Sequence, residues 1–73
     1  MTRLHPIPAR DVCKKLKKLG FTMLRQKGSH SFWEHKDGRT TVVPVHKGED
    51  LGRGLLRSIL NDIQVEIEEF YSI

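Results

Sequence analysis

The apolar residues in the first third of the chain recur at helical spacing. They lie three or four positions apart, with charged residues between them, and are Ala9, Val12, Cys13, Leu16 and Leu19. This stripe predicts an amphipathic helix over residues 9–19. Pro8 suits the first turn of such a helix, and Gly20 is the usual C-terminal stop.

Aromatic and β-branched residues dominate the middle of the chain and predict three strands. The runs are "FTMLRQ", "SFWEH" and "TTVVPVH". Lys36-Asp37-Gly38 is a strong hairpin turn between the second and third runs, and Lys27-Gly28 is a weaker turn between the first two. Pro44 cannot donate to a sheet ladder, so the third strand should be an edge strand or bulge there.

A second apolar stripe predicts another helix near the C-terminus. It is formed by Leu55, Leu56, Ile59, Leu60 and Ile63. The ending "VEIEEFYSI" predicts a short acidic helix or turn that returns Phe70 to the body, and the opening "MTRLHPIP" predicts an extended segment. The class is therefore α+β in the order α-β-β-β-α, with a short third helix. One domain over residues 1–73 should form a three-stranded antiparallel sheet with helices on one face.

The length limits the kind of protein that this fold can support. A 73-residue chain forms one small core, and such cores seldom supply more than about 3–5 kcal/mol. A deep closed pocket and a separate cofactor domain are therefore not expected, and we predict no cofactor. Cys13 is the only cysteine, so no intrachain disulfide can form. No apolar run approaches the roughly 18 residues of a membrane span and no signal peptide is visible, so we expect a cytoplasmic protein without membrane contact.

The charge is unevenly distributed along the chain. Lys and Arg total 13 against 9 Asp and Glu, which gives a formal charge of +4. All 13 bases lie in residues 1–61, whereas Asp62, Glu66, Glu68 and Glu69 follow without a base. A basic body suggests an anionic partner, most often nucleic acid. The alternative is a solvated surface that only keeps the protein soluble.

Several of the bases are candidate phosphate ligands. On the first helix they recur opposite the apolar stripe, at Arg10, Lys14, Lys17 and Lys18, with Lys15 widening that face. From strands and loops, Arg25, Lys27, Arg39 and Lys47 could extend the same surface. Such contacts would position a nucleic acid without reading its sequence.

Four histidines raise the question of a metal site. A zinc site from His30, His35 and His46 has little support, because the chain lacks both Cys-x-x-Cys and His-Glu-x-x-His spacing. We therefore predict no metal site. His5 is expected to be incidental, and His35 is expected to serve at the end of a strand.

His30 has neighbours that suit chemistry on an anion. Gly28 allows a sharp turn and close approach of a ligand, Ser29 adds a hydroxyl donor, and Lys27 adds a positive charge. An imidazole can exchange a proton near neutral pH, and a base beside an RNA 2′-hydroxyl lets that oxygen attack the adjacent phosphate. By spacing alone Gly-Ser-His is a weak motif, and a histidine at the mouth of a strand is the plain alternative.

Phe32 and Trp33 should point to opposite faces of their strand. One should enter the core beneath the helices, and the other could stack on a base. Packing in the core or on the sheet is the more common fate of both residues.

The order of these motifs resembles the HicA family of toxin ribonucleases. The resemblance runs from about Ile7 to Leu60 and rests on the following segments in order: Leu19-Gly20-Phe21, Lys27-Gly28-Ser29-His30, Asp37-Gly38, Val43-Pro44-Val45-His46 and Gly54-Leu55-Leu56-Arg57-Ser58-Ile59-Leu60. Two segments depart from the family pattern, the glycine-rich Gly52-Arg53-Gly54 and the helix end Asn61-Asp62-Ile63-Gln64.

The resemblance implies a fold similar to the double-stranded RNA-binding domain and metal-independent cleavage of messenger RNA. It implies that His30 is the catalytic histidine and that a HicB-like antitoxin covers the surface around it. The strand-end histidine of the family corresponds to His46 in this chain. Its role is open between a second proton-transfer group, a phosphate contact and a structural cap.

Two other functions compete with an RNA-cleaving toxin. One is a non-catalytic module of the double-stranded RNA-binding type, although such modules usually carry lysines at the start of their final helix, where this chain reads "LGRGLLR". The other is a protein-interaction subunit whose acidic tail, Asp62 to Glu69, binds a partner or the basic face of the same chain. The oligomeric state stays open, since an edge strand near Pro44 and the hydrophobic tail both suit self-association.

Overall fold

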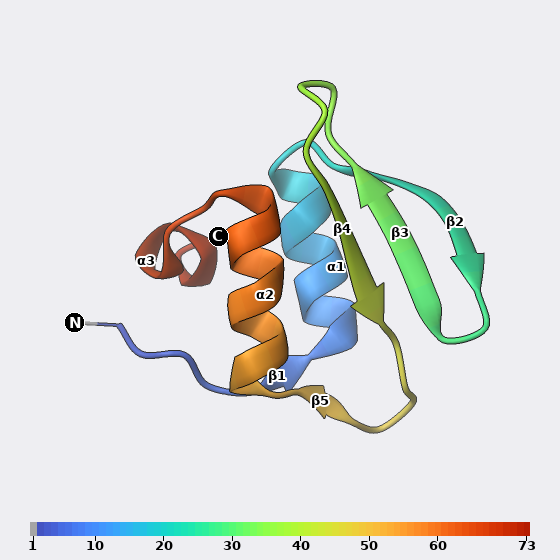
Figure 1. Ribbon diagram of the computed structural model, residues 1–73. Coiled ribbons are helices and arrows are strands. Elements are labelled where there is room, and N and C mark those ends of the chain that lie inside the picture. Colours follow the sequence, from blue (N-terminus) through green and yellow to red (C-terminus); the bar gives the residue numbers. More distant parts are fainter. Residues whose placement is uncertain (1) are drawn as a thin grey trace.

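The computed structural model describes residues 2–73 and contains the predicted α-β-β-β-α order with a short third helix. The elements are β1 (Ile7–Pro8), α1 (Ala9–Lys18), β2 (Thr22–Lys27), β3 (His30–Glu34), β4 (Thr40–Pro44), β5 (Asp50–Leu51), α2 (Arg53–Ile63) and α3 (Ile67–Tyr71). Figure 1 shows the helices gathered on one side of the sheet, which confirms the predicted layers.

The three-stranded antiparallel sheet has the order β2-β3-β4. Two residues, Gly28 and Ser29, join β2 to β3, and Gly28 has a φ of +60°, a value that suits glycine at the first central position of a tight hairpin turn. Gly38 closes the β3–β4 hairpin with a φ of +98°. β4 is an edge strand that ends at Pro44, so the prediction from this proline is confirmed.

Alternation along β3 divides its side chains between core and solvent. Ser31 and Trp33 are buried, whereas His30 and Glu34 are exposed and Phe32 is half-buried. Trp33 is therefore the aromatic residue that enters the core, and Phe32 points away from the helices. The Trp33 indole nitrogen donates to Ser31 Oγ at 3.0 Å, and that hydroxyl donates to the Val43 carbonyl at 2.8 Å.

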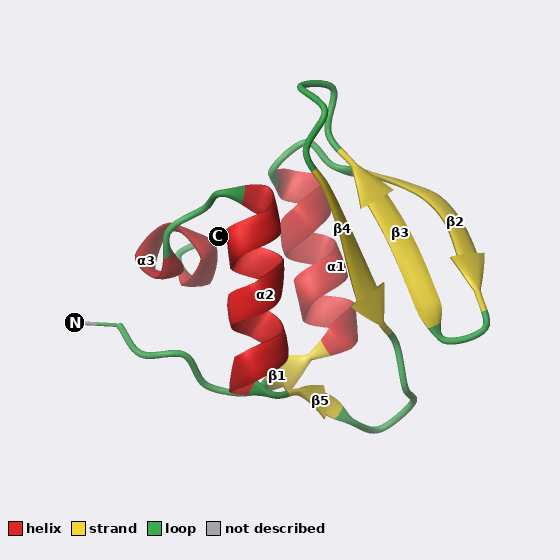
Figure 2. Ribbon diagram, viewed as in Figure 1, coloured by secondary structure: helices red, strands yellow, loops and turns green. Residues whose placement is uncertain are grey.

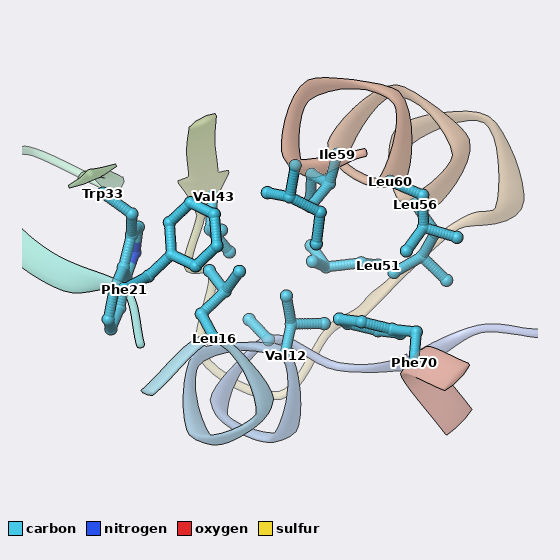
Figure 3. Packing of buried hydrophobic residues seen from close by; sticks show 12 residues of the cluster. Val12, Leu16, Phe21, Trp33, Val43, Leu51, Leu56, Ile59, Leu60 and Phe70 are labelled. Carbon is cyan, nitrogen blue, oxygen red and sulfur yellow. The ribbon is translucent and has the colours of Figure 1, made fainter. Parts of the chain in front are cut away.

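The core lies between the sheet and the helices. Leu16 of α1, Val43 of β4 and Ile59 of α2 are nearly inaccessible, and Phe21 and Trp33 pack beside them (Figure 3). At the other end of the core, Phe70 of α3 is fully buried. As predicted from the tail sequence, the last helix returns an aromatic side chain to the body.

The small sheet of β1 and β5 was not predicted from the sequence. Ile7 pairs with Leu51 and Pro8 pairs with Asp50, in antiparallel orientation. Figure 2 shows this two-stranded sheet at the start of both α1 and α2. It joins the lead-in to the loop that precedes α2 and so fixes the segment that carries His46.

The C-terminal end of α2 uses an unusual residue and a side-chain contact. Gln64 adopts the left-handed conformation at φ +57° and ψ +44°, where glycine is most common. The Val65 N–H donates to the Leu60 carbonyl, and the Arg39 guanidinium donates to the carbonyl of Ile63. Residues 61–64 depart from the family pattern, but α2 still ends at a residue in the left-handed conformation.

Candidate functional site

His30 lies at the surface, on a backbone that is held from two sides. It is the first residue of β3, where it pairs with Lys27 of β2 and Pro44 of β4. The Val45 N–H donates to the carbonyl of Ser29, which ties the Gly28-Ser29 turn to the end of β4. The backbone is therefore fixed while the imidazole stays exposed, as contact with a polymer requires.

The outer face of the sheet, which points away from the helices, places cations beside His30. Cross-strand partners in an antiparallel sheet share a face, so Lys27 lies next to His30, and Arg25 lies next to Phe32. The Arg25 guanidinium lies 4.7 Å from the centre of the Phe32 ring. Two predicted phosphate ligands thus share one face with the candidate catalytic residue.

His46 lies in the loop that follows β4, close to the start of α1. A hollow of about 340 Å³ there is lined by Pro8, Arg10, His46, Lys47, Glu49 and Asp50, among others. Because Val45 is bonded to the turn that precedes His30, this hollow adjoins the same end of the sheet. His46 and Lys47 are exposed, so both could reach a phosphate group.

The remaining cations of α1 lie in the helix layer. Lys14, Lys17 and Lys18 are exposed on the side of α1 opposite the buried Val12 and Leu16. The helices lie on one side of the sheet (Figure 1), and alternation along β3 places His30 and its cross-strand cations on the other side. The structure therefore divides the predicted phosphate ligands of residues 2–73 into an outer-face group, a group at the hollow and a helix-layer group.

Like Lys15, whose Nζ donates to the Ile73 carbonyl at 2.6 Å, Arg39 has its side chain engaged within the protein. Its Nε lies 2.8 Å from an oxygen of Asp37, and the guanidinium lies 5.2 Å from the centre of the Phe21 ring in addition to its bond to Ile63. The side-chain hydrogen bond from Arg39, assisted by one from its backbone N–H, holds the pKa of the Asp37 carboxyl below its ordinary value. These contacts were not predicted from the sequence.

His35 and His5 are occupied by structural contacts. The His35 ring packs edge-on against Phe21 with centroids 5.1 Å apart, and its Nδ1 lies 3.2 Å from Asp37, in the sheet-end position that was predicted. His5 stacks on Tyr71 at 4.4 Å, and the Tyr71 hydroxyl donates to the His5 carbonyl at 2.8 Å.

The described residues contain neither a metal-binding cluster nor a membrane-spanning helix. Within residues 2–73, no three side chains of His, Cys, Asp or Glu come together in a group that could hold a metal ion. No helix in the same range has the length and apolarity needed to cross a bilayer.

Partial burial raises the pKa of the Cys13 thiol, although the hydrogen bond with Ser31 and the charge of Lys17 oppose that shift.

Comparison with known proteins identifies the family. The family described as "HicA toxin of bacterial toxin-antitoxin" matches residues 9–65, from the start of α1 to just beyond α2. The match includes the Gly28-Ser29-His30 turn and His46. No curated protein gives a significant match. Since the family match covers most of the chain, this protein belongs to the HicA family of toxins from bacterial toxin–antitoxin systems.

Proposed function

We propose that this HicA-family protein is an endoribonuclease that cleaves messenger RNA with His30 and without a metal cofactor. The observation that carries the proposal is the exposed imidazole of His30, which stands on a fixed backbone between Lys27 and Pro44. Family membership supports a role as the toxin of a toxin–antitoxin pair.

The proposed reaction uses the RNA's own 2′-hydroxyl as the nucleophile. His30 accepts the proton of that hydroxyl, and the 2′-oxygen forms a bond to the adjacent phosphorus. The bond from phosphorus to the 5′-oxygen breaks, and the leaving oxygen takes a proton from a second donor. The products are a 2′,3′-cyclic phosphate and a free 5′-hydroxyl, so no water, oxidant or metal enters this step.

The charges around His30 suit the transition state of this reaction. Negative charge develops on the phosphate oxygens, and a cation held close to them stabilises it more than it stabilises the ground state. Lys27 is the cross-strand neighbour of His30, and Arg25 lies one row further along the same face. Ser29 is half-exposed in the turn, where its hydroxyl can donate to the same oxygens.

His46 is our candidate for the second proton donor. It follows Val45, whose N–H is bonded to Ser29, so the two histidines belong to one end of the sheet. Arg10 and Lys47, which share the hollow with His46, would hold a neighbouring phosphate.

The proposal includes a protein partner. A HicB-like antitoxin would silence the enzyme by covering the outer face around His30. The substrate places the activity in the cytoplasm, where messenger RNA is translated.

Cleavage of a defined RNA in the presence of EDTA tests the proposal. We expect His30→Ala to abolish cleavage and growth arrest while the melting temperature stays near that of the wild type, because the exposed side chain adds little to the core. The matched control is His5→Ala, which removes another exposed histidine, one that stacks on Tyr71 of α3. Wild-type cleavage by His30→Ala, or loss of wild-type cleavage on addition of EDTA, would refute the assignment.

A further inference from the structure

The outer face of the sheet has a regular arrangement that the cleavage chemistry alone does not explain. Its register forms three rows across β2, β3 and β4. The rows are Lys27–His30–Pro44, Arg25–Phe32–Val42 and Thr22–Glu34–Thr40. We call the second row the Phe32 platform. It lies one row from His30, and Figure 1 shows that no helix covers this side of the sheet in the described residues.

The Phe32 platform presents apolar surface to solvent. Phe32 is only half-buried, and Val42 keeps 38% of its surface exposed. The Arg25 guanidinium lies over the Phe32 ring at 4.7 Å, so one face of this ring already receives a flat, cationic group. A contact of this kind is weak at an exposed site, and a phosphate would draw the guanidinium away through stronger charge-assisted hydrogen bonds.

The size and charge of this face suit a single nucleotide. With strands about 4.8 Å apart and alternate residues about 7 Å apart, the three rows span roughly 10 by 14 Å. This area matches a single nucleotide, whereas a protein such as the proposed antitoxin would extend beyond it to reach the roughly 800 Å² that each partner contributes to a stable interface. Arg25 and Lys27 give it positive charge, and Glu34, the single acid of the nine positions, lies in the row farthest from His30.

We infer that the Phe32 platform binds an unpaired RNA base and thereby selects single-stranded RNA as the substrate. The base stacks on the Phe32 ring beside Val42, and the Arg25 guanidinium moves to the adjoining phosphate. A base and its own phosphate are joined by one ribose, so a base on this row brings the neighbouring 2′-hydroxyl toward His30. Bases within a duplex are stacked on both sides and cannot occupy the platform.

This inference rests on the proposed function, because it names the substrate of that reaction, and its test separates the two. The probe is a short single-stranded 2′-fluoro RNA that contains 2-aminopurine. It has no 2′-hydroxyl and cannot be cleaved by the proposed route, so binding is measured whether or not the protein is a nuclease. Anisotropy gives the Kd, and quenching of 2-aminopurine reports stacking.

Three variants define the expected result. Phe32→Leu should raise the Kd about 5- to 150-fold and remove the quenching, since this is the usual range for loss of one stacked base. Phe32→Tyr keeps a ring and should retain both signals. Leu24→Ala removes an exposed apolar side chain from the bulge of β2, outside the three rows, and should leave the Kd within twofold of the wild type.

A duplex of the same sequence provides a second comparison. It should bind without quenching and without dependence on Phe32. Lys27→Ala should reduce the salt dependence of binding to the single strand, whereas Phe32→Leu should leave that dependence unchanged.

Several outcomes would overturn the inference. One is wild-type affinity in a folded Phe32→Leu protein, and another is equal dependence of duplex binding on Phe32. If Phe32→Leu fails to fold, absence of quenching with the wild type and with Phe32→Tyr would overturn it. A Phe32→Leu variant that binds RNA normally but loses self-association in sedimentation would assign the platform to a second copy of the chain. If stacking is absent while His30-dependent cleavage stays intact, the inference is refuted and the proposed function stands. If the base stacks but the RNA is not cleaved, only the proposed function is refuted.

Discussion

Arg39 allows a direct choice between a structural residue and an RNA ligand. Its guanidinium joins three parts of the fold: the β3–β4 turn through Asp37, the end of α2 through the Ile63 carbonyl, and the core through Phe21. Replacement by alanine removes all three contacts and leaves the last carbonyl of the helix without this donor. We therefore expect Arg39→Ala to destabilise the protein.

The size of the effect follows from the separate contacts. A cation at a helix C-terminus contributes about 0.3–1 kcal/mol, and a cation–π contact contributes about 0.5–1 kcal/mol at an exposed site. A hydrogen bond to the carbonyl adds about 1 kcal/mol. The Asp37 carboxylate is exposed, so we assign no free energy to that ion pair. The expected loss is about 2–3 kcal/mol, which lowers the Tm of a domain of this size by roughly 4–8 °C per kcal/mol.

Trp33 gives the assay its signal, since it is the only tryptophan and is 98% buried. Urea unfolding followed by its fluorescence should show a lower midpoint for Arg39→Ala. Lys36→Ala is the matched control, because it removes an exposed cation from the same turn, and its free energy of unfolding should stay within about 0.5 kcal/mol of the wild type. If Arg39→Ala unfolds like the wild type but binds RNA more weakly, the structural explanation is wrong and Arg39 belongs among the phosphate ligands.

Two further predictions concern the same sheet. Because hydrogen bonds with Arg39 lower the folded pKa of Asp37, the carboxylate stabilises the fold above its ordinary pKa of 3.8, and this stabilisation disappears as the pH falls through the lowered value. The difference in Tm between the wild type and Asp37→Asn should accordingly be present at pH 6 and vanish toward pH 2. An equal difference in Tm at the two pH values would contradict this prediction. Ser31→Ala removes the hydroxyl that joins Trp33 Nε1 to the Val43 carbonyl, and leaving these buried groups unpaired should cost about 1–3 kcal/mol, measured by urea unfolding. An unchanged midpoint would show that these groups find other partners.

The main elements were predictable because their patterns are local. The stripe from Ala9 to Leu19 repeats with the period of a helix, and α1 extends over Ala9–Lys18. Gly28 and Gly38 supply the positive φ angles of the two hairpins, which set the register of the whole sheet. Once the register was set, opposite faces for Phe32 and Trp33 followed from alternation.

Contacts between distant segments were not predictable in the same way. β1 and β5 contain two residues each, too few to show a period, and they pair across more than 40 positions of the chain. The roles of Arg39 were hidden for a similar reason. A long cationic side chain can reach many groups, and the Ile63 carbonyl lies 24 positions away in sequence. Charge and spacing alone therefore suggested a phosphate ligand.

The division of the cations between the two layers of the fold changes how each group can act on RNA. Lys14, Lys17 and Lys18 recur at helical spacing, which places them on one face but does not say on which side of the sheet that face lies. Since α1 packs against the side opposite the face that carries His30, these lysines lie in the other layer of the fold. Their attraction acts on the approach and affinity of the polyanion, and such effects weaken with salt. Stabilisation of the reacting phosphate falls instead to the groups at the end of the sheet, with Lys27 beside His30 in the register. For cleavage by this route, loss of helix-layer cations should therefore alter KM, and loss of Lys27 should alter kcat.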